Sequence, residues 1–269
     1  MSSFILTVRP QPDADLDVAC LARRDVRALA SPVMVPAYLT SPERPSPEMP
    51  SPELTGGLIF TSRHAIIGFL DLFGGAVPSA WRRMPVFAVG RASGRVARDA
   101  GFEDVTTGAG GGAGLAPLVA AQRHRIAAPL LWPCAVQRGF DMVSALAPDF
   151  VVGAMPVYDM VPAESMQDEA VTALADGALS AVILMSARSA RLFREQLRFH
   201  GMEGRIASLT LIAGSKAIAE AAGAGWRQSF IARRPTRARL LAIACLFYHR
   251  MASGRVHADA ARGKGPTTE

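Results

Sequence analysis

Lysine is almost missing from this chain of 269 residues, since Lys216 and Lys264 are the only two. Neither directly follows the glycine-rich stretch Gly108–Gly114, which excludes a P-loop for nucleotide phosphates. The net charge of +6 therefore comes from arginine. An arginine-rich composition can reflect nucleotide bias in the gene alone. The functional alternative is that guanidinium groups bind carboxylates or phosphates through paired hydrogen bonds.

Cysteine and histidine are also sparse, and their spacing argues against a metal site. Cys20, Cys134 and Cys245 lie far apart without a C-x-x-C pair, which favours reduced thiols over disulfides or zinc ligands. The five histidines show no metal-ligand spacing with one another. We therefore expect no metal.

Long apolar runs are missing too. No run approaches the ~18 residues that cross a membrane, and the opening MSSFILTVRP has no basic leader, which makes a signal peptide a poor fit. We expect a cytoplasmic protein without membrane contact. Nucleic acid is weakly supported as a partner, because no aromatic residues interleave with the dense basic cluster at 233–239.

The stretch Gly108–Gly114, GAGGGAG, contains a loose form of the dinucleotide-binding fingerprint. That fingerprint needs an acidic residue for the ribose further along the chain, and Pro129–Val136 holds none. We interpret the stretch as a flexible loop, and we expect no cofactor.

What the chain does contain is an internal duplication. The stretch Leu58–Phe69, LIFTSRHAIIGF, recurs 124 residues later as Val182–Phe193, VILMSARSARLF. The pairs matched at this offset are Ile59 with Ile183, Ser62 with Ser186, Phe69 with Phe193, Gly90 with Gly214, Ala97 with Ala221, Gly101 with Gly225, and Phe102 with Trp226. The sequence therefore predicts two similar structural units.

Each copy is a short apolar run that passes through a serine into a pattern of helical period, which is typical of a buried parallel strand that leads into a helix. Ser62 and Ser186 then lie at the carboxyl ends of strands. One interpretation is that each serine only caps its helix. The other is that the two strand edges face each other and bind an anionic ligand with the helix amides.

Strands and helices alternate along the rest of the chain, which predicts an α/β fold with parallel sheets. The expected strands are 4–9, 58–61, 86–89, 104–106, 129–132, 181–185, 208–212 and 226–231. The expected helices are 10–30, 91–100, 115–124, 138–147, 165–175 and 236–250, with three more that end near 73, 200 and 222. From Ser253 onward, small, basic and polar residues predict a frayed tail.

Two connectors interrupt this alternation. Val33–Leu39 and Phe150–Pro162 each contain a Pro-x-Tyr sequence and follow a helix that ends at a proline. Between the first connector and the next strand, Thr40–Glu53 holds five prolines among serines and acids, which predicts a mobile insert.

Read in order, these features resemble the uroporphyrinogen-III synthase family. The residues that carry the resemblance are Thr7-Val8-Arg9-Pro10, Phe60-Thr61-Ser62, Val89-Gly90 with Gly101, Arg138 eight residues before Leu146, and above all Val157-Tyr158. The resemblance implies two flavodoxin-like domains, which are joined by the two connectors paired as a short ladder.

The implied domains are discontinuous. The first strand and helix return to the last third of the chain, so residues 1–32 and 164–252 form one domain and 54–149 the other. Residues 33–53 and 150–163 are connectors, with 40–53 mobile, and 253–269 form a disordered tail. Sequence alone also permits two contiguous domains, although a lone strand-helix unit at the start needs a sheet to join.

The resemblance further implies a cofactor-free, cyclising hydro-lyase that acts in haem-type tetrapyrrole biosynthesis. Its substrate, hydroxymethylbilane, is a linear tetrapyrrole polycarboxylate, which is closed to uroporphyrinogen III with inversion of ring D. We expect a monomer. The alternative is a non-catalytic, two-domain binding module for an anionic small ligand that descends from the synthase.

Under this resemblance, Tyr158 is the candidate catalytic acid, because a phenol donates a hydrogen bond at neutral pH. The alternative is that Tyr158 only packs in its connector. The candidates for binding substrate carboxylates are Arg9, Ser62, Arg63, Gly90, Arg138, Ser186, Arg188, Ser215 and Lys216. For each charged residue taken singly, a solvated surface role is the competing interpretation.

Overall fold

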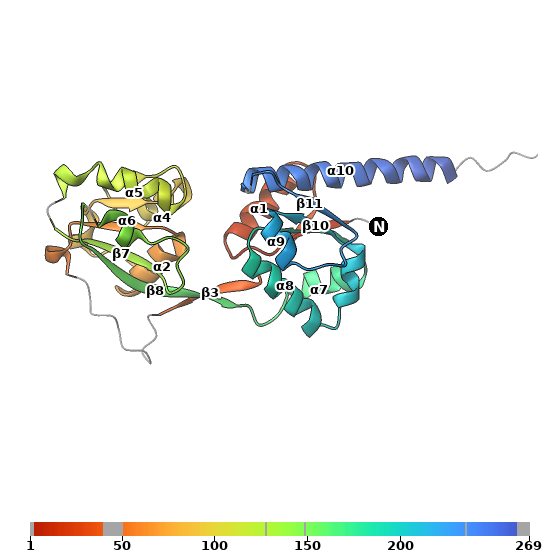
Figure 1. The fold of residues 1–269 in the computed structure, drawn as a ribbon, viewed down its shortest axis with the longest axis horizontal. Helices are drawn as coiled ribbons and strands as arrows, with labels where there is room; N and C mark the ends of the chain where they lie inside the picture. Colours follow the sequence, from red (N-terminus) through yellow and green to blue (C-terminus); the bar gives the residue numbers. More distant parts are fainter. Residues whose placement is uncertain (1–2, 40–50, 127, 148, 235, 263–269) are drawn as a thin grey trace, which may run out of the picture. The chain divides into compact units, whose positions relative to one another are not determined.

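The structure is a computed structural model that describes residues 3–39, 51–126, 128–147, 149–234 and 236–262, with backbone alone for 254–262. The chain divides into two compact units (Figure 1). Unit 1 combines Met1–Val35 with Pro162–Glu269, and unit 2 is Pro36–Val161. The connectors, which we expected as separate segments, are therefore shared between the units.

Unit 1 holds a five-stranded sheet in the order β11-β10-β9-β1-β2. Its strands are β1 (Phe4–Thr7), β2 (Ala28–Ala30), β9 (Leu179–Leu184), β10 (Thr210–Ala213) and β11 (Gln228–Ile231). Every pairing in it is parallel. Strand β1 lies between β2 and β9, with Thr7 opposite Ala30 on one side and Ile183 on the other.

Unit 2 holds a six-stranded sheet in the order β3-β8-β7-β4-β5-β6. Its strands are β3 (Met34–Tyr38), β4 (Gly57–Phe60), β5 (Val86–Ala88), β6 (Val105–Thr107), β7 (Leu130–Ala135) and β8 (Val152–Pro162). Five of them repeat the order of unit 1, with β8-β7-β4-β5-β6 corresponding to β2-β1-β9-β10-β11. The predicted α/β fold with an internal duplication is confirmed.

Helices follow the strands in both units. They are α1 (Asp13–Ala22), α2 (Arg63–Asp71), α3 (Ser79–Arg82), α4 (Arg91–Asp99), α5 (Gly112–Ala120), α6 (Met142–Leu146), α7 (Asp168–Ala175), α8 (Ala187–Phe199), α9 (Lys216–Ala221) and α10 (Arg237–Arg262). Short 3-10 turns cover Pro52–Leu54, Arg123–Arg125 and Glu203–Ser208.

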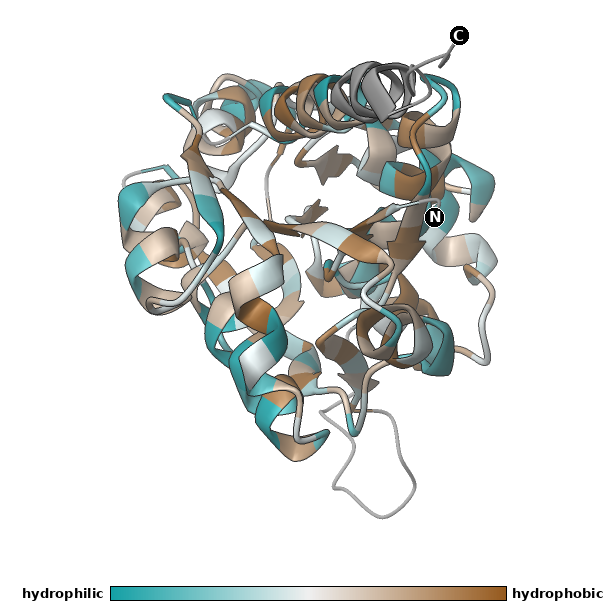
Figure 2. Cartoon of the chain, turned by 90° about the vertical axis from the view of Figure 1, so that its right-hand side faces the viewer, coloured by the Kyte–Doolittle hydropathy of each residue, from teal (hydrophilic) through white to brown (hydrophobic). Residues whose placement is uncertain are grey.

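Alternate residues of each strand are buried on opposite faces, so the sheets have a core on each side. In unit 2, Leu58 and Phe60 pack against α2 residues such as Phe69, whereas Ile59 packs with Leu115 of α5 on the other face. In Figure 2 the strands are mostly hydrophobic, and the helices that cover them are hydrophilic on their outer sides.

The two units share details of the repeat beyond strand order. Phe69 and Phe193 are both fully buried. Gly101 and Gly225 both have positive φ, 101° and 98°, a conformation that other residues rarely adopt. The 124-residue offset therefore relates equivalent turns as well as equivalent strands.

The two connectors pair as β3 and β8. The Leu39 amide donates to the Val157 carbonyl, and the Ala163 amide donates to the Val33 carbonyl. The residue numbers run in opposite directions along the pair, so the two strands are antiparallel. Pro36 lies on β3, the edge strand of this sheet. Proline has no N–H to donate, and an edge strand tolerates this because one side of it pairs with no other strand.

Two predicted helices were longer than the helices that the structure shows. The expected helix 10–30 ends at Ala22, because Asp25 takes φ 56° and Ala28–Ala30 pairs with β1 instead. A strand of three residues cannot be distinguished from a helical turn by periodicity. The expected helix 138–147 shortens to Met142–Leu146, because the Asp141 side chain caps it at the Val143 and Ser144 amides.

The expected tail was also wrong from Ser253 to Arg262, where α10 continues as a helix. Alanine and arginine are good helix formers, so this composition supports a helix that extends beyond its core contacts. The end of the predicted tail, 263–269, lies outside the described residues, as does most of the predicted mobile insert, 40–50.

Candidate functional site

The repeated serines cap the helices that follow β4 and β9. The Ser62 hydroxyl accepts a hydrogen bond from the Ala65 amide at 3.0 Å, and the Ser186 hydroxyl accepts one from the Ser189 amide at 3.0 Å. Ser215 does the same for Ile218 at 3.3 Å, after β10. All three serines therefore cap a helix, and each hydroxyl lies at the carboxyl edge of a parallel sheet.

Ser62 has a second contact that its counterpart Ser186 lacks. Its hydroxyl oxygen lies 2.9 Å from the phenol oxygen of Tyr158, which comes from β8, 96 residues along the chain. Among the residues that the structure describes, the Ser186 hydroxyl contacts only its own first turn, at Ser189. The structure therefore joins two of the candidate residues, and it does so in one copy of the repeat.

Tyr158 is 7% exposed. Burial raises the pKa of the Tyr158 phenol above its ordinary value, and the hydrogen bond to Ser62 opposes that shift. The phenol therefore keeps its proton at neutral pH. If Ser62 donates this hydrogen bond, the phenol proton of Tyr158 is available to another acceptor. If Tyr158 donates it, the hydroxyl proton of Ser62 is available instead.

A glycine lets α2 approach β8 closely enough for this contact. A Cβ at Gly68 would lie 2.7 Å from the Val157 carbonyl oxygen, a separation that real side chains do not tolerate. The residue after Val157 is Tyr158, and Ser62 begins the same helix. Close packing at Gly68 therefore brings the serine and the phenol together.

Two further aromatic groups lie beside this pair, and our sequence analysis missed their role. The Tyr38 phenol is 3.0 Å from His64 Nδ1, and the His64 ring lies 5.6 Å from the Tyr158 ring. The position of His64 two residues after Ser62 was the available signal. Burial, followed by the charge of Asp71, raises the pKa of Tyr38 to about 12.

Arg138 lines an open cleft of about 490 Å³ that also includes Phe140, Asp141 and Ala154. It follows β7, so it lies at the carboxyl edge of the unit 2 sheet. Its guanidinium is 5.5 Å from the Trp132 ring and 3.7 Å from Cys134 Sγ. Burial raises the pKa of the Cys134 thiol, while Arg138 opposes the shift.

Helices α9 and α10 begin with Lys216 and Arg237, and three more helices at these edges have an arginine as their first or second residue. Arg63 and Arg91 are the first residues of α2 and α4, and Arg188 is the second residue of α8. None of the three helices has an acidic residue in its first turn. A cation at the start of a helix is unfavourable, because the helix dipole favours negative charge at the N-terminus. The helix dipole therefore does not account for an arginine at these positions.

Gly90 is the N-cap of α4 and faces open space. A Cβ added at this position would meet its nearest heavy atom, the Gly110 Cα, at 3.9 Å. Arg91, next to it, was not among our candidates, although it occupies the same helix-start position as Arg63. Lys216 begins α9 and lies 3.7 Å from the Glu220 carboxylate on an exposed surface.

Arg9 has a different environment from the other candidates. Its guanidinium bonds to the Asp13 carboxylate at 2.8 Å and to the Asp17 carboxylate at 3.2 Å. Asp17 is 1% exposed at its side chain, and Arg237 and Thr7 also bond to it. Arg9 thus neutralises a buried acid, and this contact favours a structural role for it.

The described residues contain no group of three or more histidine, cysteine or acidic side chains able to hold a metal ion. Within the same residues, no helix is long and apolar enough to cross a membrane.

Comparison with known proteins points to one family. The family described as uroporphyrinogen-III synthase HemD matches residues 18–242. No curated protein sequence matches the chain. The crystal structure of uroporphyrinogen-III synthetase from Helicobacter pylori 26695 superposes with a TM-score of 0.57 at 18% identity, covering 92% of this chain and 100% of that one. At this identity the likeness shows a shared fold.

A second solved structure, uroporphyrinogen III synthase from the extremely thermophilic bacterium Thermus thermophilus, has 15% identity and a TM-score of 0.42, with coverage of 94% of this chain and 99% of that one. The family match spans most of the chain. The chain therefore belongs to the uroporphyrinogen-III synthase HemD family.

Proposed function

We propose that this chain closes hydroxymethylbilane to uroporphyrinogen III, with inversion of the last pyrrole ring. The family match over residues 18–242 is the observation that carries the proposal. The reaction eliminates water: the terminal hydroxyl leaves, an electrophilic azafulvene forms, and a substituted pyrrole carbon attacks it. The resulting spiro intermediate fragments and closes again as the inverted ring.

Recognition of the substrate rests on its carboxylates. Helix-start amides, together with the cations Arg63, Arg91 and Arg188, supply hydrogen bonds and positive charge at the carboxyl edges of the two sheets. Arg138 adds a guanidinium at the edge of unit 2. Because the unguided chain closes to the other isomer, the main task is to hold the polyacid in one geometry.

Tyr158 is the acid that we assign to the departing hydroxyl. Its proton is retained at neutral pH, and Ser62 fixes the direction of the phenol at 2.9 Å. When Ser62 donates to Tyr158, the phenol donates to the leaving oxygen, which departs as water. The pyrrole nitrogen supplies the electron pair, so proton donation assists a step that is already feasible.

We also propose that the protein works in the cytoplasm as a monomer. All three cysteines are free thiols, as expected for a reducing compartment. Light scattering during gel filtration tests the monomer, and a dimer at micromolar concentration would refute it.

The deciding experiment supplies purified protein with hydroxymethylbilane and separates the type I and type III products by chromatography. We expect type III to predominate over the type I product that forms without enzyme. Saturable binding of the substrate with type I product only would instead identify a non-catalytic binding module. Arg95→Ala is a suitable control, because Arg95 is exposed on α4 and pairs with Asp99 on the same helix.

A further inference from the structure

Helix α10 is much longer than its counterpart in the other unit. Helices α5 and α10 each follow the outer strand of their sheet, β6 and β11. Helix α5 has 9 residues and α10 has 26. When the two helices are aligned at their first residues, Ala120 at the end of α5 corresponds to Cys245 in α10. The turns of α10 after Cys245 are therefore additional, and they lie beyond the family match, which ends at 242.

The additional turns of α10 run past the edge of the sheet (Figure 1). Between α10 and β11 lies a cleft of about 400 Å³. The rings of Phe230 of β11 and Phe247 of α10 both line it and pack edge to face against each other, with ring centroids 6.1 Å apart. Ile243, Leu246 and Met251 add apolar lining from the helix. Leu246 is 63% exposed, so a large apolar side chain at this cleft is left uncovered.

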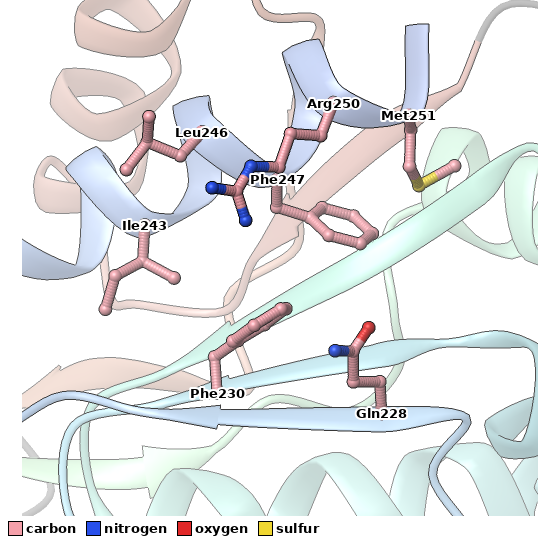
Figure 3. A pocket seen from close by; sticks show the side chains of 7 residues that line it. All are labelled: Gln228, Phe230, Ile243, Leu246, Phe247, Arg250 and Met251. Atoms are coloured by element: carbon pink, nitrogen blue, oxygen red, sulfur yellow. The ribbon is translucent and has the colours of Figure 1, made fainter. Parts of the chain in front are cut away.

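Two polar side chains enter the same cleft. Figure 3 shows the Arg250 side chain folded back along α10, while the Gln228 amide points from β11 toward the helix. Among the side chains that the structure describes, neither has a hydrogen-bond or ion-pair partner. A cleft of this size with apolar walls and a few unpaired polar groups has the composition of a small-molecule site.

We propose that this cleft binds a small amphipathic carboxylic acid. The apolar part of the ligand would lie against the rings of Phe230 and Phe247 and cover Leu246. The carboxylate would pair with the Arg250 guanidinium, whose planar fork matches two carboxylate oxygens, and would accept a hydrogen bond from Gln228. A second copy of this chain is a poorer occupant, because it would bring a further arginine-rich helix and a net charge of +6 to the same surface.

The proposed site is separate from the catalytic edge of its unit. Gln228 is the first residue of β11, so it lies at the amino end of the parallel strands. Ser186, Arg188 and Ser215 lie at the carboxyl ends. Binding in the cleft therefore does not depend on the proposed synthase activity.

Isothermal titration calorimetry of the full chain with sodium decanoate tests the proposal, with decan-1-ol as the uncharged probe. We expect one saturable site per chain and weaker binding of the alcohol. Arg250→Gln should weaken decanoate binding about tenfold, the usual effect of losing one charge-assisted pair. Arg239→Gln is the matched control, since Arg239 is exposed on the same helix and does not line the cleft.

A second variant, Leu246→Glu, places a carboxylate in the cleft at an exposed position that tolerates polarity. It should abolish decanoate binding while leaving the circular dichroism spectrum and the thermal midpoint unchanged. Equal affinity for the acid and the alcohol, equal affinity of Arg250→Gln and Arg239→Gln, retained binding in Leu246→Glu, or unsaturable uptake of decanoate would each overturn the proposal.

Discussion

The phenol oxygen of Tyr158 and the hydroxyl oxygen of Ser62 lie 2.9 Å apart, although the two residues are 96 positions apart in the chain. The Ser62 hydroxyl oxygen also accepts a hydrogen bond from the Ala65 amide, so the same oxygen caps α2 and contacts the phenol. Ser186 occupies the equivalent cap, and no tyrosine contacts its hydroxyl within the described part of the chain. The duplication has therefore kept the cap in both units and the phenol in one.

Tyr158→Phe tests the contribution of proton donation. A positioned general acid typically contributes a factor between ~10² and ~10⁴ in rate. Because the pyrrole nitrogen can expel the hydroxyl unaided, we expect kcat to fall by a factor near or below the lower figure. The product should remain the type III isomer, since the substrate is still held in one geometry. Kinetics with separation of the isomers measures both quantities.

The structural role of Tyr158 must be separated from the chemical one. The ring stays in place in Tyr158→Phe and continues to fill the unit 2 core, so the thermal midpoint should change little. If the variant lost activity only in proportion to its unfolded fraction, Tyr158 would be a packing residue and the catalytic assignment would be abandoned.

Ser62→Ala and Ser186→Ala form a matched pair at equivalent caps. Each loses one cap hydrogen bond, which typically costs about 1 kcal/mol, and we expect each to lower the thermal midpoint by about 2–4 °C. Only Ser62→Ala also removes the partner of Tyr158, so it should lower kcat further than Ser186→Ala does. Equal loss of kcat in both variants would show that the Ser62–Tyr158 contact has no catalytic importance.

Arg138 and Arg188 test the recognition of carboxylates. Replacing either by alanine should raise KM several-fold and reduce the salt sensitivity that this cation contributes, because exposed charge pairs are screened within a Debye length of ~8 Å at physiological ionic strength. Arg239→Ala controls for the loss of one positive charge. Michaelis–Menten measurements at two salt concentrations separate these outcomes, and KM unchanged in both variants would return Arg138 and Arg188 to a surface role.

The succession of strands and helices was predictable from the sequence because the duplication repeats whole strand-helix units. The run Val182–Phe193 copies the buried pattern of Leu58–Phe69, and both form a strand followed by a capped helix. Short elements could not be predicted in the same way. Ala28–Ala30 is a strand only because β1 pairs with it, and its three residues carry no periodicity of their own.

The site was predictable only in part, for a similar reason. Ser62 and Tyr158 were each visible as sequence motifs, but their contact depends on the close approach at Gly68, which is a property of the packed unit. The same holds for Arg9: the sequence Thr7-Val8-Arg9-Pro10 was visible, but the ion pairs of Arg9 with Asp13 and Asp17 were not.

Tyr38→Phe should leave catalysis nearly unchanged, because the Tyr38 phenol contacts His64 and lies outside the Ser62–Tyr158 pair. Activity in the type III assay at neutral pH measures this. A kcat below that of Tyr158→Phe would reverse the roles that we assign to the two tyrosines.

The stability of the protein at high pH should depend on Tyr38. Burial and the charge of Asp71 raise the pKa of Tyr38 to about 12 in the folded state, while the unfolded phenol keeps a pKa near 10. Between these values the unfolded chain has released the phenol proton and the folded chain has not, so the stabilising contribution is complete below pH ~10 and is lost as the pH rises towards 12. Thermal midpoints of the parent and Tyr38→Phe should therefore decline by different amounts over this range, with the smaller decline in the variant. Parallel declines would mean that the Tyr38 phenol is as well solvated in the folded protein as in the unfolded chain.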